Sequence, residues 1–326
     1  MERKAVVFDN RRQKQFPYPS LINENFDIKI FSFERCFNQK ILERYDSSLI
    51  VHLGGDGSLG FLLDVLYKAY PNENIPPVLL LGGGTANTTL RGLANLRDEG
   101  NLCDDLVNIF PEEEFAVKSY RPLCLEIDLE DEKKDEIAAY LAGFGHLTVG
   151  VTKIFERIRN GINPNLAYLA YLTAASLSLA TLHRRCQPQL LDFDGKTFSP
   201  EIKLAALAVL GVPYLATFDL NQKMSNEDFL LLSLQGKTEA ELYLKYLTTL
   251  VIGGVFAGGV DWLIRRKLIN LQKGRQVSVL PDQEKKPNAC LDGELKRFNG
   301  PLTVKRADKA VTVIIPQEIV KRYKGK

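Results

Sequence analysis

The segment LIVHLGGDGSLGF, residues 49–61, joins an apolar run, a glycine-rich turn and the start of a helical pattern. Residues 49–53 have the length and composition of a strand that is buried on both faces of a parallel sheet. The turn contains three glycines, which let the backbone approach a ligand closely because they have no side chain. Leucines then recur at the spacing of one helix face: Leu59, Leu62, Leu63 and Leu66. The segment predicts a strand, a turn and a helix.

The same pattern occurs again in PPVLLLGGGTANTTLRGL, residues 76–93. An apolar run leads through Gly82, Gly83 and Gly84 into a second helix, which Thr85 or Asn87 is expected to cap. Ligands of open α/β sheets bind beyond the carboxyl ends of the strands, where both glycine turns would lie. The two turns therefore predict a shared ligand site.

Asp56 is an unexpected residue in a turn that is otherwise suited to phosphate. A carboxylate repels a phosphate unless a divalent cation lies between them or the carboxylate serves a second substrate. Phosphoryl transfer provides both situations. Because the neighbouring glycines set the shape of the turn, the side chain of Asp56 is expected to be dispensable for the fold.

The turn has other interpretations. It could be a tight connection without a ligand. A P-loop is excluded because no lysine follows either turn. Residues 55–60, GDGSLG, satisfy the GxGxxG pattern of dinucleotide-binding folds, but the next strand ends in Gly82, Gly83 and Gly84 instead of the acid that holds the ribose.

The composition excludes several classes of protein. The 326 residues carry 42 Lys and Arg against 40 Asp and Glu, so no strong basic field favours nucleic acid. Five dispersed cysteines and three histidines indicate reduced thiols and no zinc site.

The N-terminal apolar run is too short for a signal peptide, which predicts a cytoplasmic protein. Residues 166–182 and 247–260 are shorter than the roughly 20 residues of a membrane span and are expected to form buried helices.

Beyond about residue 121 the pattern changes to short strand-like runs separated by turns such as Asp194-Gly195. The expected fold is an N-terminal Rossmann-like α/β domain, residues 1–120, followed by a C-terminal antiparallel β-sandwich domain, residues 121–326. The sequence does not decide whether the last strand, residues 311–315, and the tail return to the first domain.

In order along the chain, five segments resemble the diacylglycerol kinase catalytic-domain superfamily, which includes bacterial lipid kinases, sphingosine kinases and NAD kinases. GGDGS at 54–58 is similar to its GGDGT signature, and GGTANTTLR at 83–91 is similar to its GTGNDFAR segment. GFGHLTVG at 143–150 and NPNLAYLAYLTAAS at 163–176 resemble its glycine-rich strand and following helix. Residues 289–316 resemble its DGE motif and closing strands.

This resemblance implies an ATP site and the groups that carry the chemistry. Asp56 would serve the nucleotide metal, Mg²⁺, or activate the hydroxyl, while Asp292 would be the general base with Glu294 as its partner. From the residues alone, Asp292-Gly293 is also an ordinary hairpin turn. The residues implied to line the ATP site are Asn10, Gly54, Gly55, Gly57, Ser58, Gly84, Thr85 and Asn87.

The chain also departs from the family pattern. Asn10 in FDNRRQ is all that represents the early NPxSG motif, Thr88 replaces the acid of GTGND, and Gly60 replaces a frequent asparagine. The acidic metal cluster of some bacterial members has no clear counterpart, although Asp219 and Asp228 lie in the corresponding part of the chain.

The resemblance predicts a lipid kinase of phospholipid metabolism that transfers the γ-phosphate of Mg-ATP to a hydroxyl of diacylglycerol or a related lipid in an interdomain cleft. Basic groups at 184–185, 265–267 and 321–326 would favour peripheral contact with the inner membrane surface. A homodimer is left open. The alternatives are a non-catalytic lipid- or nucleotide-binding relative and a nicotinamide-dependent oxidoreductase that uses the GDGSLG turn.

Overall fold

The computed structural model forms two compact units, which are Met1–Pro122 with Ala307–Lys326, and Leu123–Arg306. The predicted boundary after residue 120 lies two residues before the end of the first segment. The structure describes residues 4–9, 27–32, 42, 48–72, 74–81, 88–95, 115–128, 133–159, 173–174, 177, 188–198, 203–215, 218–220, 222–255, 259–283, 287–317 and 320–321.

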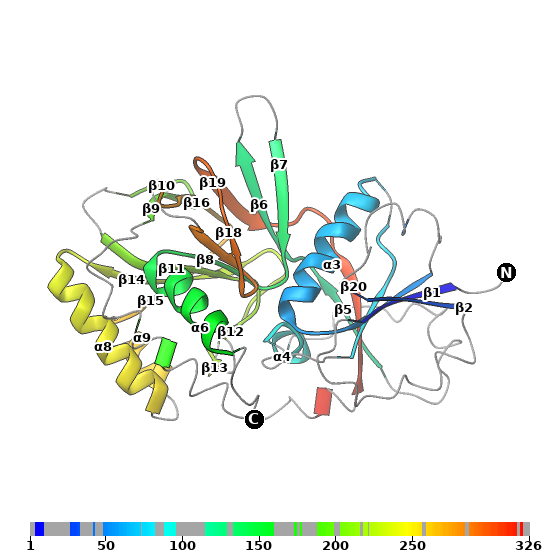
Figure 1. Cartoon of the computed structure of the whole chain (residues 1–326), viewed down its shortest axis with the longest axis horizontal. Helices are drawn as coiled ribbons and strands as arrows, with labels where there is room; N and C mark the ends of the chain where they lie inside the picture. The colour runs from blue at the N-terminus through cyan, green and yellow to red at the C-terminus, as the bar shows by residue number, and fades with distance from the viewer. Residues whose placement is uncertain are drawn as a thin grey trace. The chain divides into compact units, whose positions relative to one another are not determined.

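The first unit contains a six-stranded sheet (Figure 1). The strand order of this sheet is β2-β1-β3-β4-β20-β5. Its strands are β1 (Lys4–Asp9), β2 (Asp27–Ser32), β3 (Leu49–Leu53), β4 (Val78–Leu80), β5 (Phe115–Tyr120) and β20 (Val311–Pro316). Strands β2, β1, β3, β4 and β20 run parallel, and β5 pairs antiparallel with β20. The last strand of the chain therefore lies in the sheet of the first unit.

Both predicted strand–turn–helix units are present in this sheet. All five residues of β3 are buried, as expected for a strand covered on both faces. Helix α3 (Asp56–Ala69) follows β3 and buries Leu59, Leu62, Leu63 and Leu66, which confirms the helix face predicted from their spacing. Helix α4 (Thr88–Asn95) follows β4, and the turn at 82–87 lies outside the described residues.

The second unit contains two antiparallel six-stranded sheets. The order of the first is β10-β9-β16-β19-β6-β7, and that of the second is β15-β14-β11-β8-β17-β18. The strands of the first are β6 (Leu123–Asp128), β7 (Lys133–Ala138), β9 (Gln189–Phe193), β10 (Lys196–Thr197), β16 (Gln276–Leu280) and β19 (Leu302–Arg306). Those of the second are β8 (Leu141–Phe144), β11 (Lys203–Leu210), β14 (Phe229–Gly236), β15 (Asn270–Gly274), β17 (Ala289–Leu291) and β18 (Glu294–Lys296). A further pair joins β12 (Tyr214–Leu215) to β13 (Phe218–Asp219).

The core of the second unit lies between these two sheets. One buried apolar cluster takes side chains from both, among them Leu125 and Val304 from the first and Phe144 and Phe229 from the second. The sheets therefore pack face to face. A one-turn π-helix, η1 (His146–Gly150), leads from β8 into α6 (Val151–Arg159).

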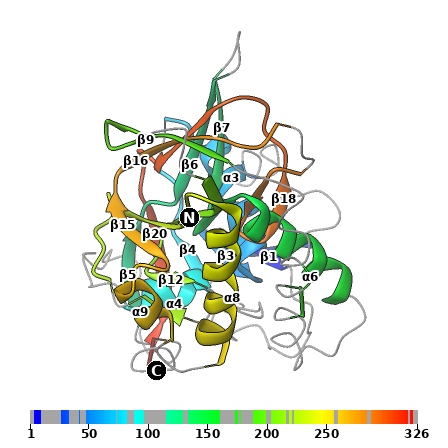
Figure 2. The same ribbon diagram turned by 90° about the vertical axis from the view of Figure 1, so that its left-hand side faces the viewer.

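The opposite face of the second sheet is covered by two helices, α8 (Glu239–Val255) and α9 (Gly259–Arg265), which lie side by side (Figure 2). Leu242 and Tyr246 of α8 and Leu263 of α9 share an apolar cluster with side chains of β11 and β14. Of the stretch 247–260, predicted as buried helix, residues 247–255 lie in α8 and residues 259–260 lie in α9, and Leu247 is 40% exposed. Most of the other apolar stretch, residues 166–182, lies outside the described residues.

No helix within the described ranges is long and apolar enough to cross a membrane.

Candidate functional site

Asp56 connects the starts of two helices in the first unit. It is the first residue of α3, immediately after Gly55, which is extended and provides no side-chain cap. The backbone N–H of Thr88 donates to Oδ2 of Asp56 (2.8 Å), and the N–H of Thr89 donates to Oδ1 (2.9 Å). The Asp56 carboxylate therefore caps α4 from the neighbouring strand–helix unit.

This contact corrects the expectation that the Asp56 side chain is dispensable for the fold. The first amides of a helix have no partner within the helix, and a carboxylate at that end also interacts favourably with the helix dipole. Asp56 supplies both for α4. Thr85 and Asn87, the caps expected from sequence, lie outside the described residues.

Thr89 places a second polar group at the start of α4. Its side chain is fully buried, and its Oγ1 has no hydrogen-bond partner in the part of the chain that the structure describes. A buried hydroxyl without a partner is unfavourable and is the kind of group that a water molecule or a ligand oxygen satisfies.

The glycine turn before α3 is held by a buried pair, His52 and Ser58. The Ser58 hydroxyl donates to the carbonyl oxygen of Gly55 (2.8 Å) and lies 2.9 Å from Nε2 of His52. Since the hydroxyl has one proton, which goes to Gly55, the imidazole must donate through Nε2. Burial lowers the pKa of His52 to about 3, so the ring is neutral. It also stacks on the ring of Phe8.

The same pair explains why residue 54 is glycine. A Cβ at Gly54 would lie 2.2 Å from Oγ of Ser58 and 3.0 Å from Nε2 of His52. These separations are too short for a side chain, because the contacting atoms belong to a buried hydrogen bond. Gly54 is therefore required by packing inside the turn, whether or not a ligand binds there.

In the second unit, Asp292 lies at the tip of the hairpin between β17 and β18. Asp292 has φ 51° and Gly293 has φ 92°, and the flanking residues Leu291 and Glu294 pair across the hairpin. Two consecutive residues with positive φ are typical of a type I′ turn, for which Asp-Gly is a favoured sequence. The hairpin interpretation of Asp292-Gly293 is therefore confirmed for the backbone.

The side chain of Asp292 is engaged as well. Its carboxylate accepts the backbone amides of Ala139 (2.5 Å), Tyr140 (2.8 Å) and Leu141 (2.9 Å), which form the turn from β7 to β8. The amide of Asp292 donates to the carbonyl oxygen of Leu141 (3.0 Å). The residue is 7% exposed, and Glu294 is partly buried on β18. Asp292 thus joins two turns of the sheet β15-β14-β11-β8-β17-β18.

Close to Asp292, Cys290 is a buried free thiol. Burial raises the pKa of Cys290 to about 11, so this thiol is protonated at neutral pH and is a poor nucleophile.

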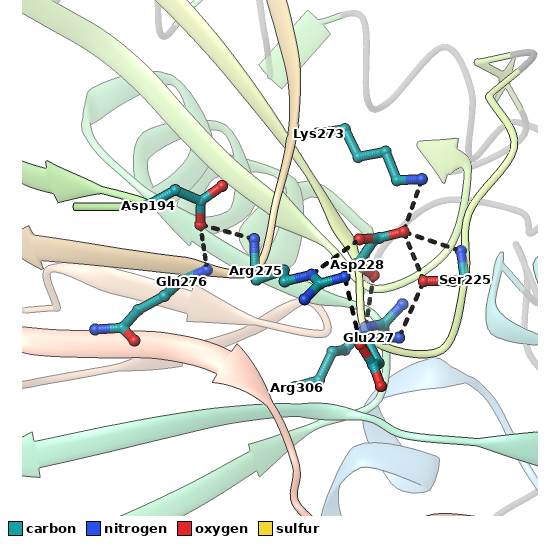
Figure 3. A network of polar contacts seen from close by, with 8 residues as sticks. All are labelled: Asp194, Ser225, Glu227, Asp228, Lys273, Arg275, Gln276 and Arg306. Atoms are coloured by element: carbon teal, nitrogen blue, oxygen red, sulfur yellow. Dashed lines mark hydrogen bonds and ion pairs between the residues drawn. The ribbon is translucent and has the colours of Figure 1, made fainter. Parts of the chain in front are cut away.

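Asp228, a residue considered for an acidic metal cluster, is part of a network with basic groups (Figure 3). Its carboxylate accepts from Nζ of Lys273 (2.7 Å) and from the Ser225 hydroxyl (2.6 Å). Burial alone would raise the pKa of Asp228, but the hydrogen bonds from Lys273 and Ser225 outweigh it and hold the pKa below its usual value. Its carbonyl oxygen accepts from Nε of the buried Arg306 (2.8 Å).

Among the residues that the structure describes, no group of three or more His, Cys, Asp or Glu is arranged to hold a metal ion. The carboxylate of Asp228 is instead paired with lysine and serine. Asp219 lies in β13.

The structure describes four of the eight residues implied to line the ATP site. Gly54, Gly55, Gly57 and Ser58 lie at the start of α3, next to the start of α4. The others lie outside the described residues: Asn10, Gly84, Thr85 and Asn87. Sequence reasoning did not single out His52, whose role follows only from its burial on β3 and its distance to Ser58.

No family model matches this chain, and no curated protein matches it. The fold resembles that of a diacylglycerol kinase from Bacillus anthracis str. Sterne, with a TM-score of 0.53, 15% sequence identity, and coverage of 95% of this chain and 96% of that one. The chain has a diacylglycerol kinase fold. The predicted resemblance to this superfamily is thereby confirmed at the level of the fold.

Two further solved structures are similar at lower TM-scores. An NAD kinase from Archaeoglobus fulgidus, determined in complex with ATP, has a TM-score of 0.40 and 14% identity, with coverage of 98% of this chain and 96% of that one. Yeast NADH kinase, determined with NADH, has a TM-score of 0.48 and 8% identity, with coverage of 97% and 84%.

Proposed function

We propose that this chain is an ATP-dependent lipid kinase, which transfers the γ-phosphate of Mg-ATP to the hydroxyl of diacylglycerol or a related lipid. The observation that carries the proposal is the contact of Asp56 with the amides of Thr88 and Thr89. It brings the N-termini of α3 and α4 together beyond two adjacent parallel strands, β3 and β4. Paired helix N-termini at this edge of an α/β sheet suit a phosphate ligand.

The nucleotide phosphates would lie against the first turn of α3. Gly55 has no side chain and provides no cap, so the amides that follow it are available to an anion. The Ser58 hydroxyl is bonded within the turn, and we assign it, with His52, the role of fixing the turn. The unpartnered Oγ1 of Thr89 adds a buried polar group that a bound ligand or its water could satisfy.

Asp56 fits a magnesium ion that is shared with the nucleotide. Each of its oxygens accepts one amide hydrogen bond, and a carboxylate oxygen has a second lone pair. Mg²⁺ commonly binds one or two carboxylates together with substrate phosphates and water, so a cluster of acids is not required. When bound, the ion would offset the negative charge of the phosphates.

Asp292 is assigned a structural role and, from the family resemblance, the role of general base with Glu294 as its partner. Its three amide contacts orient the carboxylate. These contacts support the structural role directly. The two roles are separable by mutation.

The reaction is tested by incubating the chain with Mg-ATP labelled in the γ-phosphate and with three acceptors in parallel: diacylglycerol in detergent micelles, NAD and water alone. The proposal predicts label in a chloroform-soluble product. Label on NAD alone would overturn the lipid acceptor but keep a kinase. Absence of transfer to any acceptor, with ATP binding retained, would favour a non-catalytic relative.

A further inference from the structure

The helices α8 and α9 carry a concentration of exposed apolar side chains. Six large hydrophobic residues are exposed among the described residues, and four of them belong to these two helices, so the exposure is localised. The four are Tyr243 (48%), Leu244 (65%), Leu247 (40%) and Trp262 (42%). A concentration of exposed apolar side chains commonly marks an interaction site.

The three α8 residues share one side of their helix. Leu242 and Tyr246 face the sheet and are buried, whereas Tyr243, Leu244 and Leu247 are exposed at the i, i+1 and i+4 positions. Both helices cover the same face of the sheet and contact each other (Figure 2). Their solvent-exposed residues are therefore presented by neighbouring elements.

Basic side chains lie beside these apolar residues. Arg265, Arg266 and Lys267 are exposed at the end of α9, and none forms an ion pair with any residue in the described ranges. The guanidinium of Arg266 lies over the ring of Trp262, 5.6 Å from the ring centre. Tryptophan with a stacked arginine is suited to a boundary between an apolar and a polar medium. The four apolar and three basic residues are here called the α8–α9 surface.

We propose that the α8–α9 surface binds an anionic phospholipid bilayer, with its apolar side chains among the acyl chains and its basic groups at the headgroups. This combination is the pattern of helices that lie in a membrane interface. Each well-placed basic residue near an anionic surface strengthens binding about fivefold. The biological role of this membrane binding rests on the proposed function, because a lipid acceptor would reside in such a bilayer.

A second copy of the chain is the principal competing occupant. A two-fold interface must be self-complementary, so the three basic residues would need acidic counterparts within the same surface. Glu241 on α8 is already paired with Lys245 (2.7 Å) and with the amide of Lys237. The described charges of the surface therefore complement an anionic bilayer better than they complement a copy of themselves.

The test is sedimentation of the full chain with vesicles, in the absence of nucleotide. Phosphatidylcholine vesicles are compared with vesicles that also contain phosphatidylglycerol. We expect binding to the anionic vesicles that weakens as salt is added. Leu244→Gln should weaken it about tenfold, because one leucine is no longer transferred from water. Lys267→Gly should weaken it about fivefold.

Two features of the chain make this test specific. Lys267 has φ 56°, a conformation that suits glycine, so Lys267→Gly removes a charge without damaging the end of the helix. Ile30 on β2, in the first unit, is 54% exposed, and Ile30→Gln is the matched control that should leave binding unchanged.

Three results would overturn the inference. They are failure to sediment with anionic vesicles, equal loss of binding in Ile30→Gln and Leu244→Gln, and a concentration-dependent dimer that Leu244→Gln dissociates. Because no ATP is present, each of these is independent of whether the chain proves to be a kinase.

Discussion

The carboxylate of Asp56 accepts the backbone amides of Thr88 and Thr89, 32 and 33 residues further along the chain. The contact gives Asp56 two functions. It caps α4, and it places an acid where the N-termini of two helices meet. Both oxygens act as acceptors, so replacing either with an amide nitrogen places a donor against a donor.

Asp56→Asn is therefore expected to lower both stability and nucleotide binding. The lost cap and the mismatched donor should reduce the free energy of unfolding by about 1–2 kcal/mol. Urea denaturation measures this loss, and Asp64→Asn is the matched control, because Asp64 lies on the same helix and pairs with the exposed Lys68. Equal stability of Asp56→Asn and wild type would contradict the capping role.

For Asp292, a paired comparison separates structure from chemistry. Asp292→Asn removes an acceptor from the amides of the β7–β8 turn and should lower the free energy of unfolding by about 1–3 kcal/mol. Gly293→Ala places a side chain at φ 92° and strains the β17–β18 turn by about 1 kcal/mol, but it leaves the Asp292 carboxylate in place.

If Asp292 is also the general base, its variant should lose at least about a hundredfold in turnover, while Gly293→Ala keeps most of its activity. Equal turnover of the two variants, measured well below their melting temperatures, would leave Asp292 with the structural role alone.

His52 predicts a pH dependence of stability. Its pKa of about 3 in the folded chain is below the ordinary histidine value of 6.5, so the unfolded chain binds a proton over that interval and the folded chain does not. The free energy of unfolding should fall as pH drops from 6.5 towards 3, by up to about 1.4 kcal/mol per pH unit from this group.

His52→Gln retains an amide donor for Ser58 but has no titrating ring. Denaturation curves across the interval should therefore show a shallower slope for the variant, smaller by close to one proton. Identical slopes for the variant and wild type would show that burial of His52 is not responsible.

The network around Asp228 predicts an order of effects among its basic residues. Arg306 is buried and donates to the carbonyl oxygens of Asp228 and Gly211, so Arg306→Gln should lower the free energy of unfolding by about 2 kcal/mol or more. Lys273 is half exposed, and Lys273→Gln should cost less than about 1 kcal/mol. Arg275→Gln, at an exposed and longer ion pair, serves as the near-neutral control. Thermal melts rank the three, and a larger loss at Arg275 than at Arg306 would be inconsistent with the network.

The local parts of this structure follow from the sequence. Residues that are close together in the sequence determine the strand at 49–53, the glycine turn and the leucine face of α3. The Asp292-Gly293 hairpin follows likewise from the φ preferences of two adjacent residues. Short-range preferences of this kind need no knowledge of the tertiary fold.

The partners of the important side chains could not be predicted in that way. The amides that Asp56 and Asp292 bind are more than 30 and 150 residues away in the sequence, and only the sheet order brings them together. The sequence around His52 does not indicate its role, which depends on the burial of its strand and on its contact with Ser58. Leu247 belongs to an apolar stretch predicted to be buried, yet it is 40% exposed. An apolar pattern by itself does not show which of its residues face the core.

The most direct test of the central claim is the melting temperature of the wild type and of Asp56→Asn, each with Mg-ATP and with NADH. A ligand that binds only the folded state raises its stability. If the turn at Asp56 is a nucleotide site for phosphoryl transfer, Mg-ATP stabilises the wild type, NADH does not, and Asp56→Asn loses most of the shift. Stabilisation by NADH but not by Mg-ATP, or an undiminished Mg-ATP shift in Asp56→Asn, would contradict the account.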